Sequence, residues 1–451
     1  LALEAENDFP LASNIIKRDF YMDDLLSGSN SKEEALLIKG QVTKILKKGG
    51  FNLCKWTSNL DELSAEGDHS TAINLNKGDY KILGFHWNCT DDQLKYNVNI
   101  QQISTDNITK RGILSTVSKI FDPLGLINPI VVKVKILLQL IWSQKLEWDD
   151  PLPQEIKDVW LKFVNDLSEV NNLRISRNLI PSYPYLQIEI HGFADASVKA
   201  YGACVYLRVI DSSQKITVNL LCAKSRVAPL KTISLPRLEL NAAVLLIKLV
   251  NKVIKTLNTP FHKQYLWSDS TIVLAWLAEP PHHWKQYVGN RVAKIQGCST
   301  RDDWNHVRSG DNPADIVSRG ASPSQLRDSR LWWHGPQWLS QRRESWPQMH
   351  SNSISSELTD ERRSVLVNVV NVASNSEWSV MTKFSTFTRL QRVIAFCIRF
   401  INILKQKRLN LDRTLIQNES AGKHNHNPVE RSNKRKQTLP KIITCSPLLI
   451  S

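Results

Sequence analysis

The stretch LQIEIHGFADAS, residues 186–197, decides the fold class, because it reads as a buried strand that ends on an acidic residue. The pattern after it continues as strand, strand, helix and strand. These segments are Tyr201 to Arg208, Ile216 to Ser225, about Leu235 to Leu257, and Tyr265 to Ser268. Alternation of this kind predicts an α/β layer fold with a mixed sheet.

Four acidic residues in this half of the chain lie at strand ends or helix starts. They are Asp195 in GFADAS, Glu239 in LPRLELNAA, Asp269 in LWSDST and Asp315 in GDNPAD. A single acid beside a strand is usually a turn or cap residue, but two strand ends and two helix starts can converge at one edge of a sheet. Crowded carboxylates repel one another unless cations neutralise them, and Mg²⁺ prefers carboxylate oxygen. Two such ions, about 3.5–4 Å apart, support phosphodiester cleavage. The pattern therefore predicts a site for two Mg²⁺ ions, with Mn²⁺ as a substitute.

In this order and spacing, ADAS, LELNAA, SDS and NPAD resemble the ribonuclease H domain of long-terminal-repeat retroelements over roughly residues 185–320. The resemblance implies a hydrolase, an endonuclease that cuts the RNA strand of an RNA–DNA hybrid. It also implies catalytic and metal-binding roles for the four acids, with Asp195 between the two ions. Ser270 follows Asp269 as in the family, although a helix N-cap explains it equally well.

The sequence departs from this family at one position. Cellular members place a His in a loop shortly before the last acid, whereas this chain reads HVRSGDNPAD, residues 306–315. His306 lies earlier, on an expected strand, and we expect a structural role for it. Arg308 or Asp311 would then partly replace the missing His, with slower cleavage.

The N-terminal part carries YMDD, Tyr21 to Asp24, which resembles the polymerase box of reverse transcriptases. In that box a tight turn between two strands presents adjacent carboxylates, here Asp23 and Asp24. GGFNLCKWTSN (49–59) and ILGFHWN (82–88) resemble the primer-gripping hairpin and the closing strand of the palm, and RGILSTVSKIFDPLGLINP (111–129) resembles the connecting region of Bel-Pao elements. Only 20 residues precede Tyr21, so a third carboxylate is missing. We therefore expect polymerase activity only if a longer N-terminal part is restored.

Basic residues outnumber acidic ones, 58 Lys and Arg against 43 Asp and Glu, which gives a formal net charge of +15. Such a surplus favours a polyanionic partner. Residues 282–296, HHWKQYVGNRVAKIQ, mix basic and aromatic side chains. We expect Lys285, Arg291 and Lys294 to contact nucleic acid, and the aromatic residues to pack inside.

Several classes of protein are disfavoured. The most apolar stretch, Leu124 to Trp142, contains Lys133 and Lys135 and is too charged to span a membrane. Seven scattered cysteines show neither a disulfide framework nor zinc-ligand pairs, which favours an intracellular compartment, cytoplasmic or nuclear. The sequence leaves the oligomeric state open.

These observations predict a fragment of a retroelement polyprotein in five parts. They are a truncated reverse transcriptase palm (1–100), a helical thumb or connection region (101–184), a ribonuclease H-like α/β domain (185–325), a linker toward a missing integrase (326–407) and a disordered basic tail (408–451). Two alternatives stay open, a non-catalytic nucleic-acid-binding remnant and the product of a decayed element. Smaller expectations are a helix over Ser31 to Lys48, strands over Phe51 to Trp56 and Tyr80 to Trp87, and an amphipathic helix over Phe384 to Lys405.

Overall fold

The computed structural model describes residues 1–54, 56–60, 63, 79–82, 85–98, 108–180, 184–257, 261–347, 360–363 and 386–420, with side chains as far as residue 406. The chain divides into two compact units, and the second covers Ser364–Thr438.

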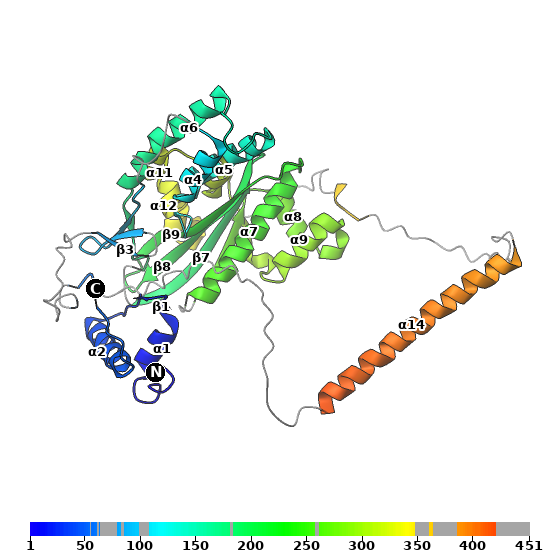
Figure 1. The fold of residues 1–451 in the computed structure, drawn as a ribbon, viewed down its shortest axis with the longest axis horizontal. Helices are drawn as coiled ribbons and strands as arrows, with labels where there is room; N and C mark the ends of the chain where they lie inside the picture. Colours follow the sequence, from blue (N-terminus) through cyan, green and yellow to red (C-terminus); the bar gives the residue numbers. More distant parts are fainter. Residues whose placement is uncertain are drawn as a thin grey trace. The chain divides into compact units, whose positions relative to one another are not determined.

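A five-stranded mixed sheet forms the centre of the first unit (Figure 1). Strands β7 (Tyr185–Ala196), β8 (Ala200–Asp211) and β9 (Ile216–Val227) form an antiparallel meander. β10 (Lys263–Ser268) pairs parallel with β7, and β11 (Trp304–His306) pairs parallel with β10. The order across the sheet is β11-β10-β7-β8-β9, which confirms the expected α/β class.

One face of the sheet is covered by α7 (Leu235–Thr256), with α8 (Thr271–Ala278) and α9 (Gln286–Gln296) beside it (Figure 1). Nine residues of α7 are buried, and they recur at the spacing of an amphipathic helix. Gly192 of β7 allows the close approach, because a Cβ there would lie 2.6 Å from Leu246 Cδ1.

The other face is covered by helices from both ends of the domain. These are α5 (Asn128–Ser143), α10 (Ala314–Arg319), α11 (Pro323–Arg327) and α12 (Arg330–His334). Trp332 links the two ends, because its indole Nε1 donates to Leu126 O at 2.9 Å and its carbonyl accepts from Tyr206 Oη at 2.8 Å. The packed unit therefore extends past both expected domain boundaries, at 185 and at 325.

The segment after α12 seals the same face, although we expected a linker there. It contains the 3-10 turns η5 (Gln337–Ser340) and η6 (Arg343–Ser345), and Trp346 is buried. Beneath it, Arg208 donates to Glu189 at 2.7 Å and to Leu339 O at 2.9 Å. Both charged side chains are about 5% exposed, so the segment keeps water from a paired charge at the middle of the sheet.

The region before the sheet contains α4 (Lys110–Ser118), α6 (Gln154–Leu167), the turn η1 (Ser168–Asn172) and the strands β3 (Asp79–Ile82), β4 (Phe85–Asn88), β5 (Gln93–Lys95) and β6 (Ile175–Ser176). These strands form a second, antiparallel sheet. β6 lies after α6 in the chain, so the closing strands of the expected palm pair with the end of the expected connection region.

The N-terminal residues form a small cluster of α1 (Pro10–Arg18) and α2 (Lys32–Lys48). Ser31 caps α2 by accepting from Glu34 N at 3.2 Å, as its sequence predicts. YMDD forms a hairpin turn between β1 (Phe20–Tyr21) and β2 (Asp24–Leu25), with Met22 at φ 57°. The strand expected over Phe51 to Trp56 is wrong, since the described residues of that stretch form no strand.

The second unit contains one long helix, α14 (Phe387–Ser420), which starts three residues later than expected and runs beyond Lys405. Residues 408–420 are helical, against the expected disordered tail, and the rest of that tail lies outside the described residues. Among the helices described, none combines the length and apolar character needed to cross a membrane.

Candidate active site

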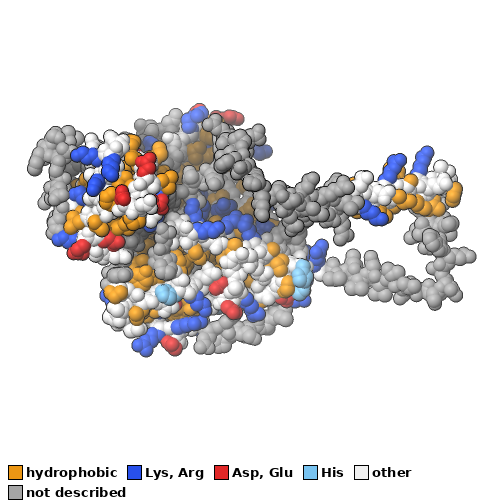
Figure 2. Space-filling model, turned by 90° about the horizontal axis from the view of Figure 1, so that it is seen from below, with side chains coloured by type: hydrophobic (Ala, Val, Ile, Leu, Met, Phe, Trp, Pro, Cys, Tyr) orange, Lys and Arg blue, Asp and Glu red, His pale blue; other side chains and the backbone are white. Residues whose placement is uncertain are grey.

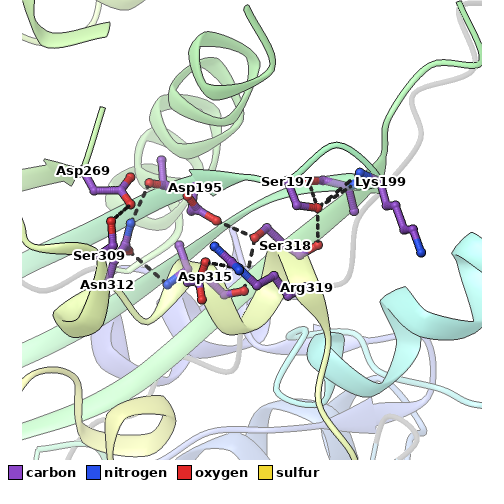
Figure 3. A network of polar contacts seen from close by, with 12 residues as sticks. Asp195, Ser197, Lys199, Asp269, Ser309, Asn312, Asp315, Ser318 and Arg319 are labelled. Carbon is purple, nitrogen blue, oxygen red and sulfur yellow. Dashed lines mark hydrogen bonds and ion pairs between the residues drawn. The ribbon is translucent and has the colours of Figure 1, made fainter. Parts of the chain in front are cut away.

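Asp195 and Asp269 lie side by side because β7 and β10 run parallel and end at the same edge of the sheet. In the register of these strands Ser268 lies opposite Ala194, so the residues that follow, Asp269 and Asp195, stand level. The third acid, Asp315, comes from α10, which packs across β7 and β8. Figure 3 shows the three aspartates together at this edge.

Asp195 is the most buried of the three, with 5% of its surface exposed. Its Oδ2 accepts a hydrogen bond from Ser318 Oγ on α10 (Figure 3). Burial raises the pKa of Asp195 to about 7, and the charges of Asp269 and Asp315 add to the rise while the Ser318 bond opposes it. The carboxylates are therefore close enough to repel one another, as crowded acids do at many reactive sites.

Asp269 is held from one side only. Its Oδ2 accepts from Ser309 Oγ at 2.8 Å, whereas its Oδ1 is buried and has no hydrogen-bond partner. Ser309 belongs to the 3-10 turn η4 (Ser309–Asp311), the loop in which the family places a His. Arg308 or Asp311 was expected to replace that His, but Ser309 is the loop residue that contacts a site acid.

Asp315 forms an ion pair within its own helix, because Arg319 Nε lies 2.5 Å from its Oδ1. The Arg319 side chain is 69% exposed, so this pair stabilises the fold by only about 0–1 kcal/mol. Asn312 fixes the start of α10: its Nδ2 donates to Ala194 O at 3.2 Å and its Oδ1 accepts from Ala314 N at 3.1 Å. Asn312 thereby joins the helix that carries Asp315 to the strand that carries Asp195.

Glu239 lies in the second turn of α7 and is partly exposed. β9 ends at the same edge as β7, since Val227 pairs with Ala200 and Tyr201 pairs with Ala196. The short connection 228–234 then leads into α7, so the helix that carries Glu239 begins near this edge. Ser270 caps α8 by accepting from Val273 N at 3.2 Å.

The described side chains do not form a ready-made metal site. Among the residues that the structure describes, no three His, Cys, Asp or Glu side chains stand together in an arrangement that could hold a metal ion. Asp195, Asp269 and Asp315 each have a hydroxyl or guanidinium partner instead. The oxygen donors nevertheless suit Mg²⁺ in kind, and the buried, unpartnered Oδ1 of Asp269 is a free ligand atom.

The three residues expected to contact nucleic acid, Lys285, Arg291 and Lys294, differ in their surroundings. The Lys285 ammonium donates to Asp360 O, and Arg291 donates to Asn241 Oδ1 at 2.6 Å while it stacks on Tyr287. Lys294 is exposed on α9 and belongs to a purely basic cluster. Its other members are Lys224 and Arg226 on β9 and Lys248 and Lys252 on α7.

The charges of this basic cluster act on one another. Burial and the neighbouring Lys294, Arg226 and Lys224 lower the pKa of Lys248. Ser225, which lies between Lys224 and Arg226, pairs with Gly202, which in turn pairs with Asp195. The β9 backbone at Ser225 is therefore two strands from Asp195, roughly 10 Å across the sheet. Lys224 pairs with Ala203 of the core beneath α7, so the cluster lies on the α7 face of the sheet, whereas Asp195 contacts Ser318 on the α10 face. Figure 2 also shows Lys and Arg side chains gathered in a band on one face of the molecule.

Comparison with known proteins identifies one family. Residues 109–270 match the family model of the Pao retrotransposon-like RNaseH-like domain. The match begins at Thr109, which caps α4 by accepting from Gly112 N, so it includes the helices before the sheet. It ends after Asp269, and Asp315 lies outside it. No curated protein matches the sequence.

Solved structures with similarity to this chain include three that illustrate the range. They are the N-terminal RNase H domain of a Mycobacterium tuberculosis protein (13% identity, 30% of this chain and 94% of that one, TM-score 0.21), LC11-RNase H1 in complex with an RNA/DNA hybrid (14%, 29% and 93%, 0.21), and the foamy viral protease-reverse transcriptase in complex with dsDNA (18%, 68% and 58%, 0.18). TM-scores this low do not support a fold assignment, so the α/β assignment rests on the strand order and pairing of the sheet.

Proposed function

We propose that this chain, whose residues 109–270 match the Pao retrotransposon-like RNaseH-like domain, acts in a retroelement pol protein, and that the edge of β7 and β10 is a nuclease centre that cuts the RNA strand of RNA–DNA hybrids. One observation carries the proposal. Asp195, Asp269 and Asp315 come from three elements to one place, where burial and mutual repulsion raise the pKa of Asp195 to about 7. A cluster of repelling carboxylates does not stabilise the fold, so its presence favours a role in binding cations and substrate.

The proposed cofactor is a pair of Mg²⁺ ions, for which Mn²⁺ can substitute. Asp195, Glu239, Asp269 and Asp315 are the proposed ligands, with Asp195 between the ions. When bound, such ions lower the pKa of a water molecule and stabilise the leaving oxygen in phosphodiester cleavage. The protein's own contribution is positional: Ser309 orients Asp269, Ser318 orients Asp195, and Arg319 neutralises Asp315 until a cation takes its place.

Binding of the substrate is proposed to use the basic cluster of Lys224, Arg226, Lys248, Lys252 and Lys294. In the described residues none of these side chains has an ion-pair partner. Their charges are thus available to phosphates, and displacement of counterions would drive the association. The hybrid is the substrate that the family resemblance implies.

The polymerase remnant is proposed to be inactive in this chain. Asp23 and Asp24 are exposed at the tip and the second strand of the YMDD hairpin, as the polymerase box requires. Reverse transcriptases hold their metal ions with a third carboxylate besides the two of this box, and Glu4, Glu6 and Asp8 lie too close to the box in sequence for that role.

A second candidate is a nucleic-acid-binding protein without catalysis. The observation that favours it is the state of the acids, each of which already has a partner within the chain, with no coordinating group of three among the described residues. The two candidates differ in whether cations can displace these partners.

The test is cleavage of a labelled RNA–DNA hybrid by the full chain in Mg²⁺, beside duplex DNA and single-stranded RNA. We expect hybrid-specific products that EDTA abolishes. Asp269→Asn should lower the rate by about 100-fold or more, because it removes a charged contact to the reacting centre. Asp302→Asn removes the same charge from an exposed position and should cleave like the wild type. Hybrid binding without cleavage in Mg²⁺ or Mn²⁺ would favour the second candidate.

A further inference from the structure

Residues 360–363 form a short strap that lies against the turn before α9. Trp284 and Arg362 form an antiparallel bridge, with Lys285 N donating to Glu361 O at 2.8 Å and Arg363 N donating to His283 O at 2.8 Å. Arg362 also pairs with Glu279 at 2.6 Å. Backbone pairing and the Arg362–Glu279 ion pair thus hold the strap in place without any help from the side chain of Glu361.

Glu361 of the strap reaches the first turn of α7. Its Oε1 lies 2.6 Å from Arg237 Nη2 and accepts from Arg237 Nε at 2.7 Å. The Glu361 side chain is only 12% exposed, and its Oε2 is buried with no hydrogen-bond partner. A buried carboxylate with one unsatisfied oxygen is costly, since each such group loses its hydration without compensation. The Glu361 carboxylate therefore occupies the position of an anion beside Arg237, but only its Oε1 has a hydrogen-bond partner there.

Arg237 is already oriented for an anion by residues other than Glu361. Its guanidinium lies 5.0 Å from the centre of the Tyr287 ring, and Arg291 stacks on the same ring at 3.5 Å. Asn241 Nδ2 donates to Tyr287 Oη at 3.0 Å, which fixes the ring against α7. Two guanidinium groups on one ring form a positively charged platform at the start of a helix, where the helix dipole also favours negative charge.

From this geometry we propose that Arg237, on its Tyr287 platform, is a binding site for a backbone phosphate of the nucleic acid, and that Glu361 occupies this site in cis as a carboxylate substitute. The inference rests on the proposed function for its substrate class. Arg237 lies in the first turn of α7 and Glu239 in the second, on different sides of the helix, so the Arg237 site is separate from the catalytic edge. Substrate must displace Glu361, and the strap therefore weakens binding until it is displaced.

The test is the affinity of the full chain for a fluorescent RNA–DNA hybrid in EDTA, measured by anisotropy over a salt series. Glu361→Gln keeps the size of the side chain and removes its charge. We expect it to tighten binding about 3- to 10-fold and to steepen the salt dependence by about one phosphate contact. Arg237→Ala should weaken binding, and the double variant should lose the whole gain.

Asp360→Asn is the matched control, because it removes the same charge one residue away, where the side chain is exposed and only the backbone oxygen contacts Lys285. It should change affinity less than about 2-fold. Equal gains in Asp360→Asn and Glu361→Gln, or a gain that survives Arg237→Ala, would overturn the proposal. This experiment measures binding and not cleavage. If Glu361→Gln binds the hybrid more tightly while the separate cleavage assay shows no products, the nuclease function is contradicted and the proposed phosphate site is supported.

Discussion

Asp195 is an acid at a buried position, where stability alone would favour a neutral side chain. Burial and the nearby aspartates raise its pKa to about 7 from an ordinary 3.8, so the folded protein holds a proton that the unfolded chain has lost. The stability that this proton supplies is fully present below about pH 4 and is lost as the pH rises through 7. Without cations, the carboxylate therefore destabilises the fold at alkaline pH.

Asp195→Asn should consequently stabilise the protein in EDTA, and more so at pH 8 than at pH 5. Each unit of pKa shift corresponds to about 1.4 kcal/mol, and structural relaxation reduces the total, so we expect a gain of roughly 2 kcal/mol at pH 8. Asparagine Oδ1 still accepts from Ser318, which limits side effects. Urea denaturation at both pH values measures the difference, and a gain that does not grow with pH would contradict the assignment.

At the scale of residues, the sequence predicted the acids better than their partners. Asp195 and Asp269 follow recognisable strands, and β10 pairs parallel with β7, so both acids reach the same edge. Ser309 and Ser318 carry no such signal, because each meets its acid only through the tertiary position of η4 or α10. Arg319 could have been found, since it stands four residues after Asp315 on one helix.

At the scale of elements, α10 depends on a glycine in the strand below it. A Cβ on Gly202 of β8 would lie 2.4 Å from Val317 Cγ1 and 2.8 Å from Val317 Cβ. Gly202 pairs with Asp195, so α10 carries Asp315 and Ser318 to the site only because this position has no side chain.

Gly202→Ala should therefore push α10 outward. We expect a loss of about 1–3 kcal/mol in unfolding free energy. Cleavage should fall by at least about 10-fold, because small displacements of catalytic groups slow reactions strongly. Gly40→Ala is the control for cleavage, since a Cβ there meets nothing within 4 Å and α2 carries no residue of the site. Val317→Ala in the Gly202→Ala background should restore part of both losses, and a failure to restore either would indicate another cause.

Elements with regular periodicity were predicted well, whereas irregular contacts were not. Helix α5 occupies most of the apolar stretch Leu124 to Trp142, but its attachment to the sheet comes from the preceding turn. There Gly125, at φ 78°, lies so close to β9 that a Cβ would meet Ala223 O at 1.9 Å, and Asn128 Nδ2 donates to Ala223 O at 3.0 Å. A periodic sequence pattern does not reveal such contacts between a turn and a strand. For that reason the sequence pattern placed α5 in a region of its own, residues 101–184, apart from the sheet.

At the scale of the whole molecule, the sheet has two apolar faces, and the range 185–325 covers only one of them in full. On the other face it supplies α10, and the remaining cover comes from residues on both sides of the range. They are Phe85, Trp87, Leu126, Ile127 and Ile130 before it, and Leu326, Trp332, Leu339 and Trp346 after it. The longer family match, which starts at residue 109, agrees with this extent at the N-terminal side.

A fragment of residues 185–325 should therefore fail to fold cooperatively, while a fragment of residues 79–347 should fold. The shorter one would expose Tyr206 and Phe193 to water and leave the Glu189–Arg208 pair uncovered, because Leu339 O and Gln341 O no longer accept from Arg208. Burial of each large side chain contributes about 1.5–3 kcal/mol, so the lost cover exceeds the usual stability of a domain. Thermal unfolding followed by near-ultraviolet circular dichroism separates the cases: one sharp transition is expected for 79–347 and none for 185–325. A sharp transition in the shorter fragment would mean that the tryptophan-rich segment and α5 are dispensable additions to a complete domain.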